Sequence, residues 1–378
     1  MKNHREGRRL KISIIGTRGY PSFYGGFETA VRHIAPRFAD NGMDVSVYGR
    51  KNSILENWAG RDERIQSVLT TGFDTKIWST LSYGLTSVLH VALRKHDVVL
   101  IMNVANGFWL PILKILKVPT AVNVDGIEWE RQKWSKAAKV VFKIGAWFTA
   151  KFADEIICDS KHIAEYWNLS FGRRGVYIPY GGVIPSASMR LPQGLKPKEY
   201  VLVVSRFVPE NTIAEFLSAA DQLAKKYKVV LVGSSGYGSS FEDKIQLMSE
   251  KNPNVIWLGH VSDEAELDSL WSSAGAYFHG HSVGGTNPAL VQAMYCGAPI
   301  VARDTVYNRE VLGSAGKFVN PNSNEIYSAI DMLMTNLNLA SDFSKSAQKR
   351  AIENYSWNQV SDSYILVLEQ LVNPSKVG

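Results

Sequence analysis

Short runs rich in valine, isoleucine and leucine alternate along this chain with longer segments that have helical spacing. Such alternation predicts parallel β-sheets with helices on both faces, because parallel strands are joined by crossover helices. The first series of predicted strands comprises residues 10–15, 45–48, 98–102, 120–124, 155–158 and 176–178. The second series comprises residues 200–204, 229–232, 255–258, 276–278, 300–302 and 317–319. We therefore predict an α/β protein with two doubly wound, Rossmann-like domains.

A segment rich in proline, glycine and serine, residues 178–199, separates the two series. A chain of 378 residues exceeds the size at which one hydrophobic core usually stops growing. We predict an N-terminal domain at residues 1–185 and a second domain at residues 186–355. The last segment, residues 356–378, has helical period and no strand after it, and we expect it to pack back on the first domain. Two such domains can face each other across a cleft.

The composition is that of a soluble globular protein, with 45% hydrophobic and 20% charged residues. No apolar run approaches the ~20 residues of a membrane-spanning helix, and the basic first residues lack the apolar segment of a secretory signal. Two cysteines in separate halves suit a reducing compartment, so we expect a cytoplasmic protein. The net charge of +7 favours anionic partners such as nucleotides or phospholipids. The absence of zinc-finger spacing and of an RNP-like aromatic signature argues against nucleic acid.

A glycine-rich segment, GTRGYPSFYGGFETA at residues 16–30, joins the first predicted strand to a predicted helix at residues 27–40. Such a turn lets backbone N–H groups approach an anion, and the helix N-terminus adds partial positive charge. The segment fits neither G-x-G-x-x-G nor G-x-x-x-x-G-K-[ST], and Arg50 and Lys51 stand where an acid would bind an NAD ribose. Because Arg50 and Lys51 could bind the extra phosphate of NADP, an NADP-dependent oxidoreductase remains an alternative function. A second alternative is that the glycines only shape a tight turn.

Six motifs resemble a bacterial subgroup of family four of the retaining glycosyltransferases, several members of which are rhamnosyltransferases of polysaccharide assembly. The motifs are GTRGYP…YGGFET at residues 16–29, DGIEWERQKWSK at 125–136, CDSK at 158–161, IPYGG at 178–182, SRFVPEN at 205–211 and HGHSVGGTNPALVQAM at 279–294. They occur in both predicted domains, so the resemblance covers nearly the whole chain. It implies the GT-B fold, an acceptor site on the first domain, and a donor diphosphate above Gly25 and Gly26.

The resemblance places the nucleotide-sugar mainly on the second domain. There Arg206 matches an arginine that contacts the diphosphate, and a planar guanidinium can hold two phosphate oxygens at once. The alternative for Arg206 is a surface ion pair. Many relatives carry a lysine where this chain has Asn211, so one of the two usual cations is missing. Arg18, in the opening loop, is a candidate substitute.

Many relatives also carry a Glu-x(7)-Glu motif, whose first glutamate faces the donor sugar and whose second faces the ribose hydroxyls. This chain has Gly284 and Gln292 at those positions. The turn of Gly284, Gly285, Thr286 and Asn287, followed by a predicted helix, indicates a phosphate and sugar cradle built from main-chain N–H groups. Gln292 is a weaker acceptor for two hydroxyls. This change is compatible with a deoxyribose donor such as dTDP-rhamnose.

Asp125 ends a predicted strand and Glu128 follows it. A carboxylate at this place can orient an acceptor hydroxyl or take its proton, although Asp125-Gly126 also suits an ordinary turn. The resemblance implies a reaction on one face of the sugar in which the leaving phosphate accepts the proton, so a protein base is not required. It implies neither an essential metal nor a cofactor. His279 and His281 flank a glycine without a carboxylate partner in the motif, which argues against a metal site.

Lys136, Lys139 and Lys143 share one face of a predicted helix, and Trp147 belongs to its broad apolar side. One interpretation is a solvated lysine face on a packed helix. The other is an interfacial surface, with lysines on anionic head groups and aromatic residues at the boundary.

Together these features predict a retaining, metal-independent glycosyltransferase that is cytoplasmic and peripheral on the inner face of the plasma membrane. Its predicted reaction moves rhamnose from dTDP-rhamnose to a lipid-linked saccharide. The alternative from another class is a degenerate GT-B protein that binds a nucleotide or a partner without turnover. The missing lysine and glutamates favour that alternative, whereas the retained glycine loops, Arg206 and Asp125 argue against it.

Overall fold

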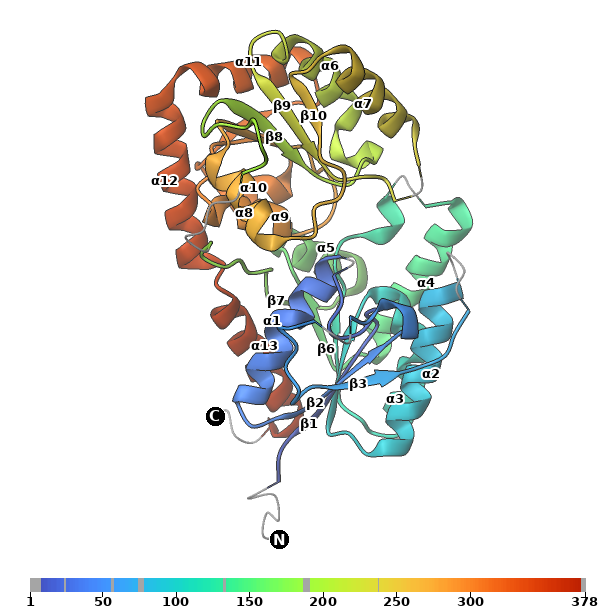
Figure 1. The fold of residues 1–378 in the computed structure, drawn as a ribbon. Coiled ribbons are helices and arrows are strands. Elements are labelled where there is room, and N and C mark those ends of the chain that lie inside the picture. The colour runs from blue at the N-terminus through green and yellow to red at the C-terminus, as the bar shows by residue number, and fades with distance from the viewer. Residues whose placement is uncertain are drawn as a thin grey trace. The chain divides into compact units, whose positions relative to one another are not determined.

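The computed structural model describes residues 8–23, 25–55, 58–73, 78–131, 134–185, 191–236 and 238–374 (Figure 1). The chain forms two compact units, each with its own parallel sheet. The first unit contains Met1–Glu130, Trp134–Pro179 and Trp357–Gly378, and the second contains Arg131–Lys133 and Tyr180–Ser356. The predicted α/β class with two Rossmann-like domains is therefore confirmed.

The first unit is built on a seven-stranded sheet with the order β3-β2-β1-β4-β5-β6-β7. Its strands are β1 (Lys11–Ile15), β2 (Asp44–Gly49), β3 (Gln66–Leu69), β4 (Val98–Met102), β5 (Thr120–Asn123), β6 (Glu155–Cys158) and β7 (Val176–Tyr177). All neighbouring strands are parallel. Six of these strands were predicted. β3 was not predicted, because its sequence QSVL is short and lies at the sheet edge, where none of its side chains is fully buried.

Helices cover both faces of this sheet. They are α1 (Gly26–Asp40), α2 (Trp78–Arg94), α3 (Leu110–Ile115), α4 (Lys136–Phe152), α5 (Lys161–Phe171) and α13 (Trp357–Val372), with short 3₁₀ helices η1 (Lys51–Ser53), η2 (Val104–Trp109) and η3 (Glu128–Glu130). Figure 1 shows α1 and α13 on one side of the strands and α2, α3 and α4 on the other. Right-handed crossovers require this division, because β2 and β4 flank β1 on opposite sides.

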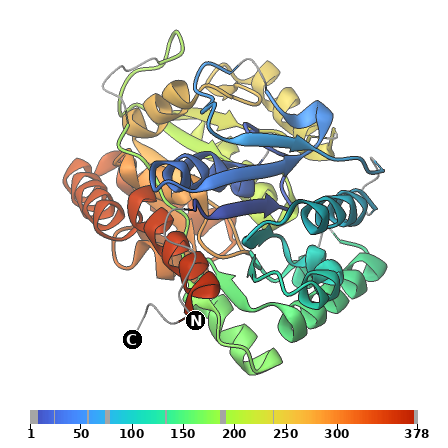
Figure 2. The same ribbon diagram turned by 90° about the horizontal axis from the view of Figure 1, so that it is seen from below.

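The last helix, α13, is part of the first unit and packs against α1 (Figure 2). The ring of Trp357 stacks on His33 with centroids 4.5 Å apart, and Asp362 accepts a hydrogen bond from Arg37 at 3.1 Å. Its inward side buries Tyr364 and Leu368 against the sheet. The first unit is therefore assembled from both ends of the sequence.

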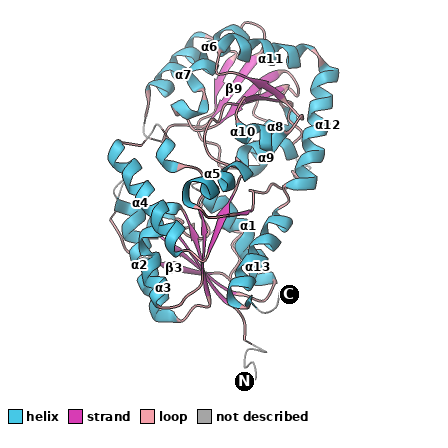
Figure 3. Cartoon of the chain, turned by 180° about the vertical axis from the view of Figure 1, so that it is seen from behind, coloured by secondary structure: helices cyan, strands magenta, loops and turns pink. Residues whose placement is uncertain are grey.

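The second unit has a six-stranded parallel sheet with the order β10-β9-β8-β11-β12-β13 (Figure 3). The strands are β8 (Tyr200–Val204), β9 (Lys228–Val232), β10 (Val255–Trp257), β11 (Ala276–His279), β12 (Ile300–Arg303) and β13 (Lys317–Val319). The helices are η4 (Pro209–Asn211), α6 (Ile213–Leu223), α7 (Ser240–Lys251), α8 (Glu264–Ser273), α9 (Pro288–Tyr295), α10 (Val306–Leu312), α11 (Ser323–Thr335) and α12 (Leu337–Asn354). All six strands were predicted to within one residue at each end.

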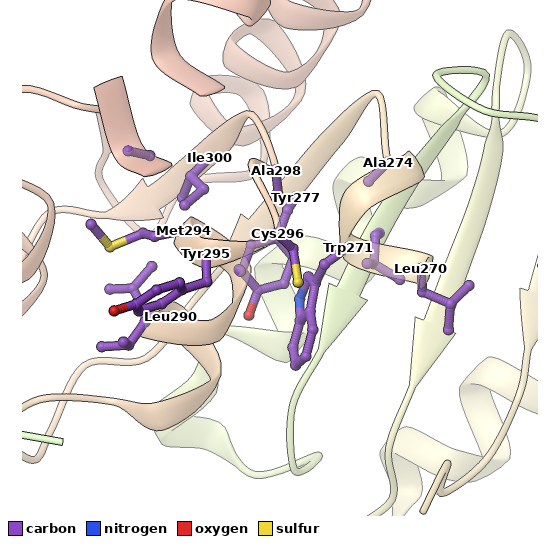
Figure 4. Close-up of a cluster of buried hydrophobic side chains, with 14 of the residues drawn as sticks. Leu270, Trp271, Ala274, Tyr277, Leu290, Met294, Tyr295, Cys296, Ala298 and Ile300 are labelled. Carbon is purple, nitrogen blue, oxygen red and sulfur yellow. The ribbon is translucent and has the colours of Figure 1, made fainter. Parts of the chain in front are cut away.

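Alternate residues of these strands enter two hydrophobic cores, one on each face of the sheet. Leu202 and Tyr277 belong to the core that includes α8 and α9, whereas Val201 and Phe278 belong to the core that includes α6 and α11. Figure 4 shows the first of these cores, where Trp271 meets Tyr277 edge to face with ring centroids 6.1 Å apart. Because both faces are covered, the strands read as continuous apolar runs.

The chain passes from the first unit to the second after Pro179, within the predicted linker but earlier than residue 185. Part of that linker, residues 186–190, lies outside the described residues. The chain returns to the first unit after Ser356. Within the second unit the two passages are neighbours, because the N–H of Gly182 donates to the carbonyl of Tyr355 at 2.8 Å.

Candidate functional site

In each sheet the strand order reverses at one place, between β1 and β4 in the first unit and between β8 and β11 in the second. Ligands of open α/β sheets bind outside the carboxyl ends of the strands at this switch point. In the second unit the segments that leave β8 and β11 are residues 205–211 and 280–287. These segments contain most of the residues that the sequence predicted for the donor.

Arg206 is the second residue after β8, and its side chain is exposed. The turn that presents it is closed by Asn211, whose Nδ2 donates to the carbonyl of Arg206 at 2.7 Å. Asn211 itself is 1% exposed. The residue that stands in place of the usual lysine is thus a buried amide that shapes the Arg206 turn.

Hydrogen bonds with Glu210 of η4 and with Thr212 hold the segment that follows β11. Ser282 donates to the carbonyl of Glu210 through both its N–H, at 3.0 Å, and its hydroxyl, at 2.8 Å. The hydroxyl of Thr212 donates to the carbonyl of Gly280 at 2.6 Å. A Cβ on Gly280 would overlap the carbonyl of Asn211, so only glycine fits there. The two predicted donor segments are therefore fixed to each other.

The turn formed by Gly284, Gly285, Thr286 and Asn287 leads directly into α9. Gly284 has φ +99°, a conformation that favours glycine, and Thr286 is 3% exposed. Asn287 caps the helix, because its side chain accepts a hydrogen bond from the N–H of Ala289 at 2.9 Å. The partial positive charge of the α9 N-terminus thus lies next to the turn.

A cation that sequence reasoning missed lies beside this turn. Nη2 of Arg131 is 3.4 Å from the position that a Cβ on Gly284 would occupy, and Arg131 is 8% exposed. Arg131 is grouped with the second unit. The motif that contains it gave no signal of this contact, since 153 positions separate the two residues along the chain.

Gln292, on α9, uses its amide within the second unit. Its Oε1 accepts from the N–H of Val183 at 3.0 Å, and its Nε2 donates to the carbonyl of Val183 at 3.1 Å and to Oδ1 of Asp268 at 2.9 Å. Burial raises the pKa of Asp268, and the hydrogen bonds from Gln292 and Cys296 oppose that shift. A ribose hydroxyl would therefore have to compete with these partners for Gln292.

In the first unit the glycine-rich loop folds tightly over the sheet. Gly16, at φ +86°, lies so close to the carbonyl of Met102 that a Cβ would overlap it. The N–H of Arg18 donates to Oε1 of Glu28 at 3.0 Å, and Glu28 is 5% exposed in the first turn of α1. A Cβ on Gly25 would lie 3.5 Å from Oε2 of Glu28. A carboxylate that the sequence analysis had not singled out thus lies beside Gly25 and Gly26.

Asp125 follows β5 with φ +54°, an unusual conformation for a residue other than glycine. Its N–H donates to Oδ1 of Asn123 at 3.0 Å, and Nδ2 of Asn123 donates to the hydroxyl of Tyr364 at 2.6 Å. The helix α13 therefore supports the turn that carries Asp125. Glu128 is 6% exposed, and its Oε2 accepts a hydrogen bond from Nε1 of Trp134 at 2.8 Å.

A small pocket, with room for about one water molecule, lies at the carboxyl ends of β1, β2 and β3, beside α2. It is lined by Gly16, Thr17, Tyr48, Gly49, Arg50, Thr70, Thr80, Tyr83, Gly84 and Ser87. The guanidinium of Arg50 lies 4.7 Å from the ring centre of Tyr83, and the hydroxyls of Thr70 and Ser87 are 3.3 Å apart. Hydroxyls, an aromatic ring and a cation are groups that bind saccharides and phosphates.

His279 is buried, and its Nδ1 lies 3.1 Å from the hydroxyl of Tyr277. Burial lowers the pKa of His279 to about 3, so its ring is neutral at physiological pH. Among the residues that the structure describes, no three His, Cys, Asp or Glu side chains are grouped as metal ligands.

The predicted basic helix is α4. Lys136 and Lys143 are exposed, Lys139 is half-buried, and Trp147 is 50% exposed. The apolar residues Val140, Ile144 and Trp147 of α4 are exposed. The buried residues of α4 are instead small: Ala138, Gly145, Ala146 and Thr149.

Comparison with known proteins relates each half of the chain to a family. Residues 190–350 match the family described as Glycosyl transferases group 1, and residues 79–183 match a domain of unknown function, DUF1972. An uncharacterized glycosyltransferase of Methanocaldococcus jannaschii is 29% identical over 168 residues, which cover 43% of this chain and 42% of that protein. The match thus spans less than half the length of this curated relative.

Solved structures extend the similarity to the whole chain. The sucrose-phosphate synthase of Thermosynechococcus elongatus superposes with a TM-score of 0.81 at 20% identity, over 97% of this chain and 100% of that one. Anabaena HepE, solved in complex with UDP and glucose, superposes with a TM-score of 0.72 at 15% identity, over 96% and 100%. The chain has the GT-B fold, and its second half matches Glycosyl transferases group 1. These relationships do not favour an NADP-dependent oxidoreductase or a protein without turnover.

Proposed function

We propose that this protein is a retaining glycosyltransferase that moves a sugar from a nucleotide-sugar to a lipid-linked saccharide in cell-surface polysaccharide synthesis. The observation that carries the proposal is the location of Arg206 and the Gly284–Asn287 turn at the switch point of the second sheet. The match to Glycosyl transferases group 1 over the same unit supports it, as does the UDP complex of HepE. The motif resemblance favours dTDP-rhamnose as the donor.

On the donor side, the guanidinium of Arg206 binds the diphosphate, and the N–H groups of Gly284 to Asn287 and the α9 N-terminus bind it from the main chain. Arg131 adds a cation beside Gly284 and compensates for the lysine that Asn211 replaces. Gly25, Gly26 and Arg18 of the first unit remain proposed contacts, and Gln292 keeps the Val183 segment in place. Stabilising the departing diphosphate in this way requires no metal.

On the acceptor side, Asp125 orients the attacking hydroxyl of the saccharide, with Glu128 beside it in the same segment. The bond from the anomeric carbon to the diphosphate oxygen breaks, and the bond to the acceptor oxygen forms on the same face of the sugar. The stereochemistry is retained because the new bond forms on the face from which the diphosphate leaves, and the acceptor proton passes to the leaving phosphate oxygen. A lipid-linked acceptor places the protein at the cytoplasmic face of the plasma membrane as a peripheral protein.

Ligand-induced stabilisation tests the donor assignment. We expect dTDP-rhamnose and dTDP to raise the melting temperature more than UDP-, GDP- and CMP-sugars, because a ligand that binds only the folded state stabilises it by ~2.7 kcal/mol at 100 times its Kd. The measurement is a thermal-shift panel, followed by mass spectrometry of the product formed on a lipid-linked saccharide. If no nucleotide raises the melting temperature, the donor site is wrong. Binding without donor hydrolysis or transfer would instead favour the degenerate protein.

Tyr364→Phe tests whether α13 positions Asp125. Removing the hydroxyl leaves Nδ2 of Asn123 without the acceptor that it now has at 2.6 Å, so the Asp125 turn loosens. We expect kcat to fall about tenfold while the donor KM stays within twofold, since most of the proposed donor residues, Arg206 and the Gly284–Asn287 turn among them, belong to the second unit. Ser363→Ala, which removes the hydroxyl of a half-buried neighbour on the same helix, is the matched control. Equal changes in kcat and in donor KM would indicate a general structural defect instead.

A further inference from the structure

Three helices of the first unit lack acidic residues. α2, α3 and α4 lie side by side on one face of the sheet (Figure 1) and contain neither aspartate nor glutamate. Their basic residues, histidine apart, are Arg94, Lys114, Lys136, Lys139, Lys143 and Lys151. The complete chain has 35 acidic residues in 378, so helices of this combined length would ordinarily contain several. This layer is therefore uniformly basic.

The same layer exposes large apolar side chains. They are Leu89 and Leu93 of α2, Ile115 of α3, Leu116 at the end of α3, and Val140, Ile144 and Trp147 of α4. Leu93 and Ile115, 83% and 81% exposed, are the two most exposed large hydrophobic side chains in the described part of the chain. We call these seven residues and the six cations the basic apolar face. Clustered exposure of this kind marks an interaction surface.

The packing of α4 explains why this exposure arises. The helix contacts η2 through small residues, and a Cβ on Gly145 would lie 2.9 Å from the carbonyl of Val104. Close packing on the small side leaves Val140, Ile144 and Trp147, spaced by four and three residues, on the outward side with Lys136 and Lys143. A helix that only covered a core would turn its large apolar residues inward.

We propose that the basic apolar face docks on an anionic phospholipid bilayer, with Leu93, Ile115 and Trp147 entering the head-group region and the lysines contacting lipid phosphates. Charge complementarity selects this partner, because three helices with six cations and no acidic residue attract an anionic surface. Lys114 pairs with Asp154, at 2.5 Å, so the free contribution comes mainly from the α4 lysines. In the described part of the chain, no helix is long and apolar enough to cross a membrane.

This inference rests on the proposed function in one respect, namely that a lipid-linked acceptor lies in the same membrane. The test uses sedimentation with vesicles of phosphatidylcholine alone or with phosphatidylglycerol, and no acceptor is present. We expect the protein to bind the anionic vesicles, the double variant Leu93→Asp/Ile115→Asp to bind at least tenfold more weakly, and Lys136→Glu/Lys139→Glu/Lys143→Glu to bind about 100-fold more weakly.

Matched controls lie on the second unit. Leu247→Asp/Leu337→Asp changes two exposed leucines, and Lys244→Glu/Lys251→Glu/Lys345→Glu makes the same change in net charge. We expect both to bind within threefold of the unmodified protein. Unchanged binding of the Leu93/Ile115 variant, or loss of self-association as its only effect, would overturn the proposal. Donor hydrolysis, measured in solution without vesicles, tests the proposed function separately.

Discussion

Arg206→Ala is expected to lower kcat/KM for the nucleotide-sugar by about 10²–10³-fold. The guanidinium is exposed at the carboxyl end of β8, next to the switch point, and its turn is closed by the hydrogen bond from Asn211. A bidentate contact to the diphosphate strengthens as charge develops on the leaving group, so the loss appears in kcat as well as in KM. Steady-state kinetics with the donor identified by the thermal-shift panel measure both.

Two further variants isolate the cause of this effect. Arg206→Lys keeps the charge but not the planar fork, and we expect it to recover about tenfold of the loss. Lys345→Ala removes an exposed cation elsewhere on the second unit and is expected to leave kcat/KM unchanged. An Arg206→Ala enzyme with kinetics within twofold of the unmodified protein would remove Arg206 from the donor site.

Gln292→Glu is expected to destabilise the protein by ~3 kcal/mol at pH 7, although it restores the residue that many relatives carry. The new carboxylate oxygen would replace the Nε2 that now donates to Asp268 at 2.9 Å and to the carbonyl of Val183 at 3.1 Å. Two half-buried carboxylates at that separation repel each other. Chemical denaturation at pH 7 measures the loss.

The loss of stability caused by Gln292→Glu depends on pH. Burial already raises the pKa of Asp268 in the folded protein, and a second carboxylate raises the pKa of the pair further. The folded state then binds more protons than the unfolded state, whose carboxyl groups titrate near pH 4, so stability falls as pH rises through this window. The variant should therefore approach the unmodified protein below about pH 4.

A double substitution provides the control. Asp268→Asn in the Gln292→Glu background offers an N–H donor to the new carboxylate and is expected to recover most of the lost stability. Equal stability of Gln292→Glu and the unmodified protein at pH 7 would mean that the contact between positions 268 and 292 does not form in solution. The pair explains why the chain has glutamine here, since Asp268 requires a donor beside it.

The fold was predictable because both sheets are parallel and buried on both faces. Their strands therefore read as continuous apolar runs, and twelve of them were identified within one residue at each end. β3 was missed because an edge strand with exposed side chains has no such run. Helix α4 was identified, but its packed side was not. Small residues such as Gly145 and Ala146 let α4 pack closely on η2. A search for regularly spaced large apolar residues does not find such a side of a helix.

The sequence predicted the positions of candidate site residues only where a single short motif contains them. Arg206 and the turn at Gly284 follow their strands, and motif position placed them correctly at the strand ends. The contacts of Arg131 with the Gly284 turn and of Asp268 with Gln292 join distant segments, so no local pattern indicates them. Glu28 was within the quoted glycine segment, yet its burial beside the N–H of Arg18 depends on how that loop folds.

The discontinuity of the first unit has a consequence for biosynthesis. The helix that covers part of its sheet and holds Asn123 through Tyr364 is made after the entire second unit. A ribosome-bound chain therefore exposes the surface of α1, β4 and β5 that α13 covers until the second unit has been synthesised, and a fragment that ends at Pro179 keeps that surface open. The first unit therefore cannot be produced as one contiguous segment of the sequence, and cutting the chain at Pro179 separates its sheet from α13.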